Sequence, residues 1–403
     1  MRRLQPQWLV VAAGVCAALH VGKLPAALPV LRDALGVSLL QAGFLLSLVQ
    51  FAGMALGLAV GLAADAIGLR RTMLAGLGLL AGASGLGAAA DQPSQLLVLR
   101  AVEGMGFLLA TMPAPGLIRR LVLPGQLNAA LGVWSAFMPL GTALALLGGP
   151  AVIALAGWQA LWLLLAAITL LMALSLAIVV PADPRHEGSA ALPAGWPVRL
   201  RQTLTARGPW LVALCFAVYS AQWMSVIGFL PSIYAQAGLA VGWTAVATAG
   251  AAAVNIVGNV AAGRLLQRGA LPDRLLLAGY AAMALGAWIA FGPLAQTLSP
   301  GAGAAVRYGA VLLFSMLGGM IPGTLFSLAV RLAPGEHTVS TTVGWMQQWS
   351  CLGQFAGPPL VAWVAHRAGG WQWTWLVTGG CAVLGMALVR GARRRLRGNP
   401  ARP

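Results

Sequence analysis

Long apolar runs dominate the chain, and short polar segments separate them. A helix that crosses a bilayer needs about 20 apolar residues, and twelve runs reach that length. They cover residues 8–31, 41–62, 72–90, 95–117, 129–154, 159–180, 210–235, 243–263, 275–294, 308–333, 339–364 and 373–390. The runs lack the alternation of membrane β-barrel strands. The pattern therefore predicts an all-α integral membrane protein with twelve transmembrane helices.

The longest polar segment, residues 182–208, divides these spans into six and six. The halves repeat at a fixed offset, so that Trp8 aligns with Trp210 and Gly61 with Gly263. Duplicated membrane units of this kind suit rocking of one bundle against the other around a central site. We predict two pseudo-symmetric six-helix bundles. The expected parts are an N-terminal bundle at 1–181, a cytoplasmic linker at 182–208, a C-terminal bundle at 209–390 and a basic cytoplasmic tail at 391–403.

Composition and charge exclude a soluble protein. Hydrophobic residues make up 59% of the chain and charged residues 8%, against the roughly 25% charged residues of soluble domains. The net charge of +17 comes from arginines that gather in alternate loops, and the positive-inside rule then places both termini in the cytoplasm. We expect a multi-pass protein of the cell inner membrane, with no nucleic-acid partner, because the basic tail suits lipid headgroups. A monomer without cofactor or metal is expected.

The loop between the second and third spans carries a family motif. Residues 61–71 read GLAADAIGLRR, which resembles the GxxxDxxGxRR signature of the major facilitator superfamily. Span four also contains RAVEG at residues 100–104, similar to the family's RxxxG motif, and the overall texture resembles its cyanate/nitroimidazole permease branch. The family usually has a basic residue where Ala66 stands. The resemblance implies alternating access and a cytoplasmic gate formed by Gly61, Asp65, Gly68, Arg70 and Arg71, in which Asp65 accepts hydrogen bonds from a helix N-terminus.

Four ionisable side chains lie inside the predicted spans at similar depth. Lys23, the sole lysine, follows His20 by one helical turn, and Arg100 and Glu103 are three residues apart on span four. Charges within a bilayer cost several kcal/mol and by default mark a functional site. We predict that the four meet. Lys23, His20 and Arg100 would then bind an anionic solute while Glu103 couples a proton, with His20 as the alternative proton carrier. A cluster that only neutralises itself is the structural alternative.

The second half supplies uncharged polar and aromatic groups at matching depth: Gln222, Trp223, Asn255, Gln348 and Trp349. We predict that these residues line a substrate pocket, although some of them will instead make hydrogen bonds between helices. The predicted function is a secondary active transporter that moves a small anion with a proton, as symporter or antiporter. A multidrug proton antiporter that exports xenobiotics is the alternative. An integral-membrane enzyme is disfavoured because four scattered histidines form no nucleophile–base or metal constellation.

Overall fold

The structure is a computed structural model of the 403-residue chain, and it describes residues 5–37, 39–183, 195–296, 300–393 and 396. The expected linker segment 184–194 and most of the tail 391–403 lie outside the described residues. Within that described part, all regular secondary structure is helical. The predicted all-α class is therefore confirmed, together with the twelve-span arrangement in two six-helix bundles.

The first six spans are built from seven helices, because the fourth and fifth spans are each broken and the fifth and sixth are joined within α7. The fourth span is broken near Pro113, whose missing N–H cannot continue a helix. The sixth span is the second part of α7, which turns sharply at Gly157, where φ is 81°. The helices are α1 (Pro6–Leu35), α2 (Leu39–Ile67), α3 (Leu69–Gly87), α4 (Pro93–Thr111), α5 (Ala114–Leu121), α6 (Leu127–Trp134) and α7 (Phe137–Val179), with the 3₁₀ turn η1 at Pro124–Gln126.

The second half repeats this design with its eighth and tenth spans broken. The tenth span starts at Pro300, eight residues before the predicted start, because the alanine-rich segment around Arg307 continues the helix. The elements are α8 (Trp196–Thr205) in the linker, then α9 (Arg207–Gln236), α10 (Val241–Ala253), α11 (Asn255–Gln267), α12 (Pro272–Phe291), η2 (Pro293–Gln296), α13 (Pro300–Gly318), α14 (Met320–Arg331), η3 (Glu336–Thr338), α15 (Val339–Ala368), η4 (Trp371–Trp373) and α16 (Thr374–Gly391).

The outer surface of the helices is apolar, as a lipid environment requires. Nine stretches of described helix are long and apolar enough to cross a membrane. The most apolar of them, residues 124–179, is also one of the least buried, and Leu155 and Ile178 are 87% and 83% exposed. Side chains of this kind would be unfavourable in water. The chain is therefore a multi-pass membrane protein.

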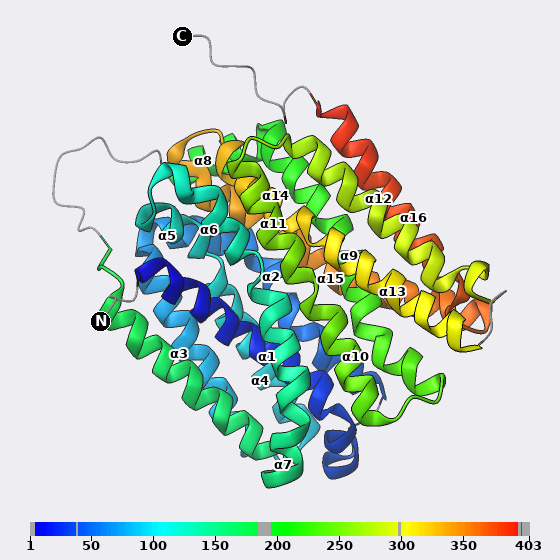
Figure 1. Ribbon diagram of the computed structural model, residues 1–403. Helices are drawn as coiled ribbons and strands as arrows, with labels where there is room; N and C mark the ends of the chain where they lie inside the picture. The colour runs from blue at the N-terminus through cyan, green and yellow to red at the C-terminus, as the bar shows by residue number, and fades with distance from the viewer. Residues whose placement is uncertain (1–4, 38, 184–194, 297–299, 394–395, 397–403) are drawn as a thin grey trace.

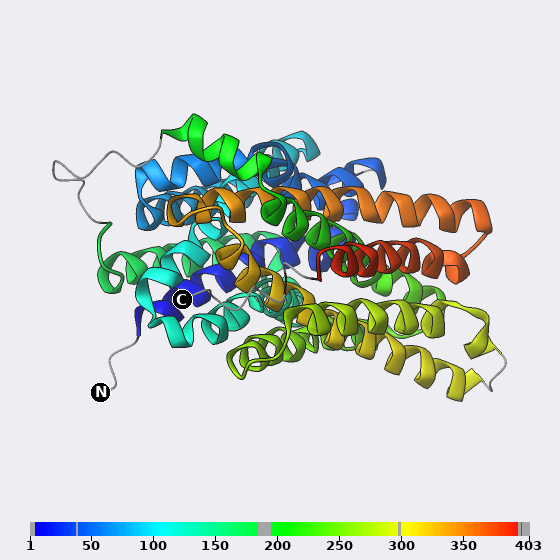
Figure 2. The same cartoon turned by 90° about the horizontal axis from the view of Figure 1, so that it is seen from above.

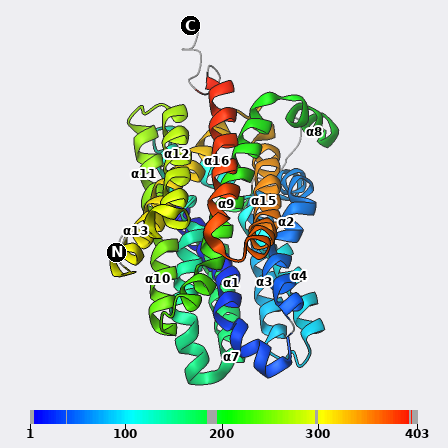
Figure 3. The same cartoon turned by 90° about the vertical axis from the view of Figure 1, so that its right-hand side faces the viewer.

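The two bundles lie side by side, with α1–α7 to the lower left and most of α9–α16 to the upper right in Figure 1. Their long helices run between two ends, as Figure 2 shows from above. We call the end that carries α5, α6 and α8 the linker end. Helix α8 lies at the periphery of this end, beside α2 and α15 (Figure 3). Helices α2 and α15 pack closely across the boundary between the bundles.

Candidate functional site

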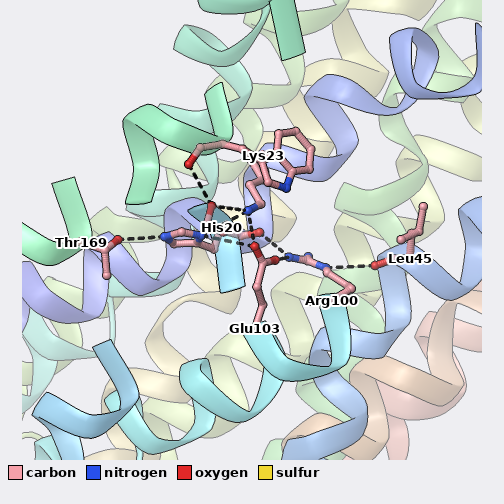
Figure 4. Close-up of polar contacts among 8 residues, drawn as sticks. His20, Lys23, Leu45, Arg100, Glu103 and Thr169 are labelled. Carbon is pink, nitrogen blue, oxygen red and sulfur yellow. Dashed lines mark hydrogen bonds and ion pairs between the residues drawn. The ribbon is translucent and has the colours of Figure 1, made fainter. Parts of the chain in front are cut away.

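A cluster of four ionisable side chains lies inside the first bundle. Lys23 on α1 is fully buried, and its ammonium donates to Glu103 Oε1 on α4. It also donates to Ser84 Oγ on α3 at 2.9 Å, and it lies 4.5 Å from the ring centre of Trp162 on α7. Figure 4 shows Lys23 beside His20 and Glu103. The compact Lys23 head is therefore enclosed by groups that compensate for its lost hydration.

The arginine of the cluster connects Glu103 to two neighbouring helices. Arg100 donates from Nη1 to Glu103 Oε2 at 2.8 Å and to the His20 carbonyl of α1 at 2.7 Å. Its Nε donates to the Leu45 carbonyl of α2 at 3.1 Å (Figure 4). Arg100 is 3% exposed and Glu103 is 2% exposed. The charge state of Glu103 thus bears directly on a guanidinium that fastens α4 to α1 and α2.

The histidine of the cluster is held as a neutral ring. An ammonium can only donate, so His20 Nδ1, 3.3 Å from the Lys23 ammonium, is the acceptor. The opposite nitrogen, Nε2, then carries the proton and donates to Thr169 Oγ1 on α7 at 2.8 Å. With His20 neutral, the two cations and the carboxylate leave one net positive charge inside the bundle. A proton added to Nδ1 would point toward the ammonium, although Nδ1 also lies 3.9 Å from Glu103 Oε1.

A separate cavity of about 590 Å³, counting its open mouth, lies between the bundles. Its described lining combines aromatic side chains with amides and hydroxyls, and it includes no Asp, Glu, Lys, Arg or His. The lining residues are Gln50, Phe107, Ser135, Phe137, Met138, Pro139, Phe216, Tyr219, Ser220, Trp223, Asn255, Pro322, Phe326, Gln347, Ser350, Cys351 and Gln354.

The structure separates the residues that the sequence assigned to one substrate pocket. Trp223 and Asn255 line the cavity. Gln222 is buried, donates to the Val218 carbonyl of its own helix, and is absent from the lining. Two others lie between helices: Gln348 accepts from the Leu58 N–H across the α2–α15 contact, and Trp349 packs on Trp210. His20, Lys23 and Arg100 come together with Glu103, as expected, but in the first bundle and outside the cavity lining.

The motif segment begins where α2 packs against α15. A Cβ on Gly61 would lie 2.9 Å from the Ser340 carbonyl and 3.2 Å from Gly344 Cα, so the two helices need this glycine to approach each other. Gly68 has φ of 107°, which also favours glycine. The Asp65 side chain, predicted to cap a helix here, lies outside the described residues. We therefore keep its gate role as a prediction.

Asp183 caps α3 beside the motif segment. Its carboxylate oxygens accept from the backbone N–H groups of Arg70 and Arg71 at 3.1 and 3.0 Å. Arg120 on α5 lies 3.6 Å from the same carboxylate. A Cβ on Gly68 would meet Asp183 Oδ2 at 2.4 Å, so that glycine makes room for the cap. The sequence analysis did not single out Asp183, because nothing in the apolar periodicity shows which helix a loop carboxylate will reach.

Removal of this cap is expected to loosen the linker end. Asp183→Ala should lower the free energy of unfolding by about 1 kcal/mol, the usual cost of a lost helix N-cap with its charge. Thermal unfolding of the purified protein measures this effect. Asp91→Ala is the matched control, because that exposed loop aspartate lies near the start of α4 at the opposite end. An equal midpoint for both variants would contradict the capping role.

Further contacts join the two bundles at the linker end. Arg119 on α5 binds Glu336 in η3 at 2.7 Å, and Gln267 on α11 donates to the Gly125 carbonyl of η1 at 2.7 Å. The tightest contact is between α6 and α11, where a Cβ on Gly132 would lie 2.7 Å from Gly263 Cα. Because Gly61 and Gly263 are equivalent in the sequence repeat, the glycine contacts of α2–α15 and α6–α11 are related by pseudo-symmetry. The linker end is closed in this structure.

Gln50, Ser84 and Thr169 are among the contributors to the cavity and the cluster that the sequence alone did not identify. Gln50 lines the cavity. In the sequence it stands out as an amide in the middle of an apolar span. Ser84 and Thr169 bind Lys23 and His20, but small hydroxyls are common in membrane helices and carry little signal by themselves. Only the packing of α1 against α3 and α7 identifies them.

Comparisons with known proteins agree on one family. The model of the Major Facilitator Superfamily matches residues 10–358. Among solved structures, FucP in the outward conformation superposes with a TM-score of 0.74 at 17% identity, covering 96% of this chain and 98% of that one. The proton:xylose symporter XylE, bound to 6-bromo-6-deoxy-D-glucose, gives a TM-score of 0.76 at 15% identity, covering 96% and 95%. At these identities the likeness shows the fold alone.

A curated relative shares part of the sequence. The tetracenomycin C resistance and export protein of Streptomyces glaucescens is 30% identical over 188 residues, which are 45% of this chain. The match spans 34% of that relative's length, so that protein's activity as a whole does not transfer. The family model, in contrast, covers most of the chain. The chain therefore belongs to the major facilitator superfamily, whose members are membrane transporters of small molecules rather than enzymes.

Proposed function

We propose that this protein is a proton-coupled secondary transporter that moves an organic solute through the central cavity by alternating access. The observation that carries the proposal is the buried cluster, in which the single carboxylate of Glu103 holds two cations. A proton on Glu103 would weaken both ion pairs at once, because a neutral carboxyl attracts neither cation strongly. The cluster therefore has two states that differ in the contacts between helices.

Arg100 connects the two protonation states of Glu103 to the boundary between the bundles. Its Nε binds the Leu45 carbonyl of α2, and α2 is the helix that packs on α15 of the second bundle. Release of Arg100 from Glu103 changes how firmly α2 is held, and α2 carries the gate glycine Gly61. Protonation and closure of the linker end are thereby coupled through one helix, as linkage between two sites requires.

The absence of charged side chains from the described cavity lining indicates which charge the solute carries. The predicted anionic solute depended on Lys23 and Arg100 reaching the pocket, whereas both cations face Glu103 in the first bundle. An anion in a cavity with an uncharged described lining would lose hydration without a cationic partner. The lining and the partial likeness to an export protein favour the alternative drawn from the sequence, a proton antiporter that exports organic compounds. We place the protein in the inner membrane as a monomer, with the linker end and both termini cytoplasmic.

Transport in proteoliposomes tests the proposal. Vesicles with an imposed pH gradient are offered a panel of neutral, anionic and cationic organic solutes, and internal pH and solute content are followed together. We expect one class of solute to dissipate the gradient as it accumulates, and we expect a protonophore to abolish that accumulation. Accumulation that persists with the protonophore present, or that needs Na⁺ instead, would refute proton coupling.

A further inference from the structure

The cavity carries a chain of hydrogen bonds that crosses from one bundle to the other. Gln50 on α2 donates from Nε2 to Gln354 Oε1 on α15 at 3.0 Å. Gln354 donates in turn to Ser350 Oγ at 3.2 Å, and Ser350 shares a 2.7 Å hydrogen bond with Ser220 on α9. All four residues line the cavity. We call this chain the amide bridge.

Most hydrogen-bond donors of the lining are already used within the protein. The Trp223 indole donates to Ser315 Oγ at 3.1 Å, and Asn255 Nδ2 donates to the Ser315 carbonyl at 2.6 Å. Gln50 Nε2 is used in the amide bridge. Its other amide atom, Oε1, is buried and accepts no hydrogen bond in the described structure. Gln50 is a lining residue of the cavity, so this unsatisfied buried acceptor belongs to a side chain at the cavity wall. A ligand can satisfy the acceptor only by donating a hydrogen bond.

Six aromatic side chains contribute to the rest of the wall, and its described lining contains no Asp, Glu, Lys, Arg or His. Phe107 and Phe137 contribute from the first bundle, and Phe216, Tyr219, Trp223 and Phe326 contribute from the second. Such rings bury flat apolar surface and prefer offset or edge contacts with another ring. Gln347, also in the lining, adds an amide for which the structure shows no side-chain partner among the described residues. The wall thus matches a flat ring system better than a flexible chain or an ion.

We propose that this cavity binds an uncharged, planar aromatic solute that carries a hydroxyl or amide donor, and that Gln50 Oε1 accepts from that donor. The inference rests on the proposed transport function, since it names the class of solute that occupies the cavity. It also gives the solute a position at the boundary of the bundles. A solute that engages Gln50 lies against the α2–α15 contact through which the bundles meet.

Equilibrium binding with four matched probes tests this assignment. The protein is placed in lipid nanodiscs without any gradient, and empty nanodiscs serve as the blank for partitioning into lipid. The probes are 2-naphthol, 2-methoxynaphthalene without the donor, 2-naphthoate with a negative charge and decahydro-2-naphthol without the aromatic rings. We expect 2-naphthol to bind about tenfold more tightly than the methyl ether, as an orphaned buried acceptor implies, and more tightly than the other two.

Substitution of Gln50 tests whether this residue causes the difference in affinity between 2-naphthol and its methyl ether. In Gln50→Leu, the affinities for 2-naphthol and 2-methoxynaphthalene should come within about twofold of each other. Gln372→Leu, which removes an exposed amide in η4, should keep the wild-type difference. Gln50→Ala replaces the leucine variant if that variant fails to fold, and the comparison of probes on the wild type needs no variant.

Three results would each overturn the assignment: 2-naphthoate binding at least as tightly as 2-naphthol, equal affinity for 2-naphthol and its methyl ether in the wild type, or no saturable binding above the blank. The experiment contains no pH gradient, so a failure of proton coupling leaves its result unchanged. Conversely, a transporter that uses protons but binds 2-naphthoate would retain the proposed function and lose this solute class.

Discussion

Replacement of Glu103 by glutamine is expected to abolish solute accumulation driven by a pH gradient while leaving solute exchange intact. One proton per solute across a gradient of one pH unit sustains about a tenfold concentration ratio, since about 1.36 kcal/mol corresponds to a factor of ten. Glu103→Gln has no titratable carboxyl, so this ratio should fall to about one. Exchange of labelled for unlabelled solute requires no net proton movement and should continue.

Glu103→Gln also removes a buried negative charge, so a second variant is needed to separate loss of the proton carrier from loss of stability. The single substitution leaves Lys23 and Arg100 without their carboxylate, and loss of one partner from a buried ion pair costs about 3–5 kcal/mol. Glu103→Gln combined with Lys23→Met restores the original net charge of the cluster, because one cation leaves with the anion. We expect this double variant to fold, to exchange solute and to lose accumulation. Accumulation that survives in the double variant would place the proton carrier elsewhere.

The positions of the spans could be predicted well because lipid imposes a single requirement on every helix. Apolar runs of about 20 residues located the twelve spans, and the three-residue spacing of Arg100 and Glu103 correctly placed both on one side of α4. The similar depths of Lys23 and Glu103 along their helix axes also predicted the contact between them. Each of these predictions uses only the period and rise of a helix.

The direction in which the cluster faces could not be predicted in the same way. Depth fixes the height of Lys23 in the membrane but not the rotation of α1, and that rotation decides between cavity and bundle interior. The contact between Gln50 and Gln354 joins residues 304 positions apart, so it depends on which helices meet across the boundary. The contact of Asp183 with α3 depends on the conformation of a loop, and no periodic pattern in the sequence predicts that conformation. The sequence thus predicts the depth of each residue in the membrane and the spacing of residues along one helix. Which residues of different helices contact each other depends on how the helices pack.

The glycine contact between α6 and α11 gives the last prediction, in which bulk at Gly263 opens the linker end. A Cβ on Gly263 would lie 2.6 Å from the Asn128 carbonyl and 2.8 Å from Gly132 Cα, both in the other bundle. Backbone atoms cannot move aside as a flexible side chain would, so the helices must separate. Overpacking of this kind costs about 1–3 kcal/mol, and here the cost falls only on the closed state.

Gly263→Ala should therefore shift the ratio of closed to open linker ends by about tenfold or more, and Gly263→Leu by more still. Spin labels at Leu123 and Arg274, exposed positions of the two bundles at this end, report the separation by double electron–electron resonance. Gly78→Ala is the matched control, because a Cβ there meets nothing within 4 Å. A distance distribution that stays unchanged in Gly263→Leu would mean that this contact does not limit closure. A shift without loss of binding in the cavity would show that the glycines control access, since they lie outside the cavity lining.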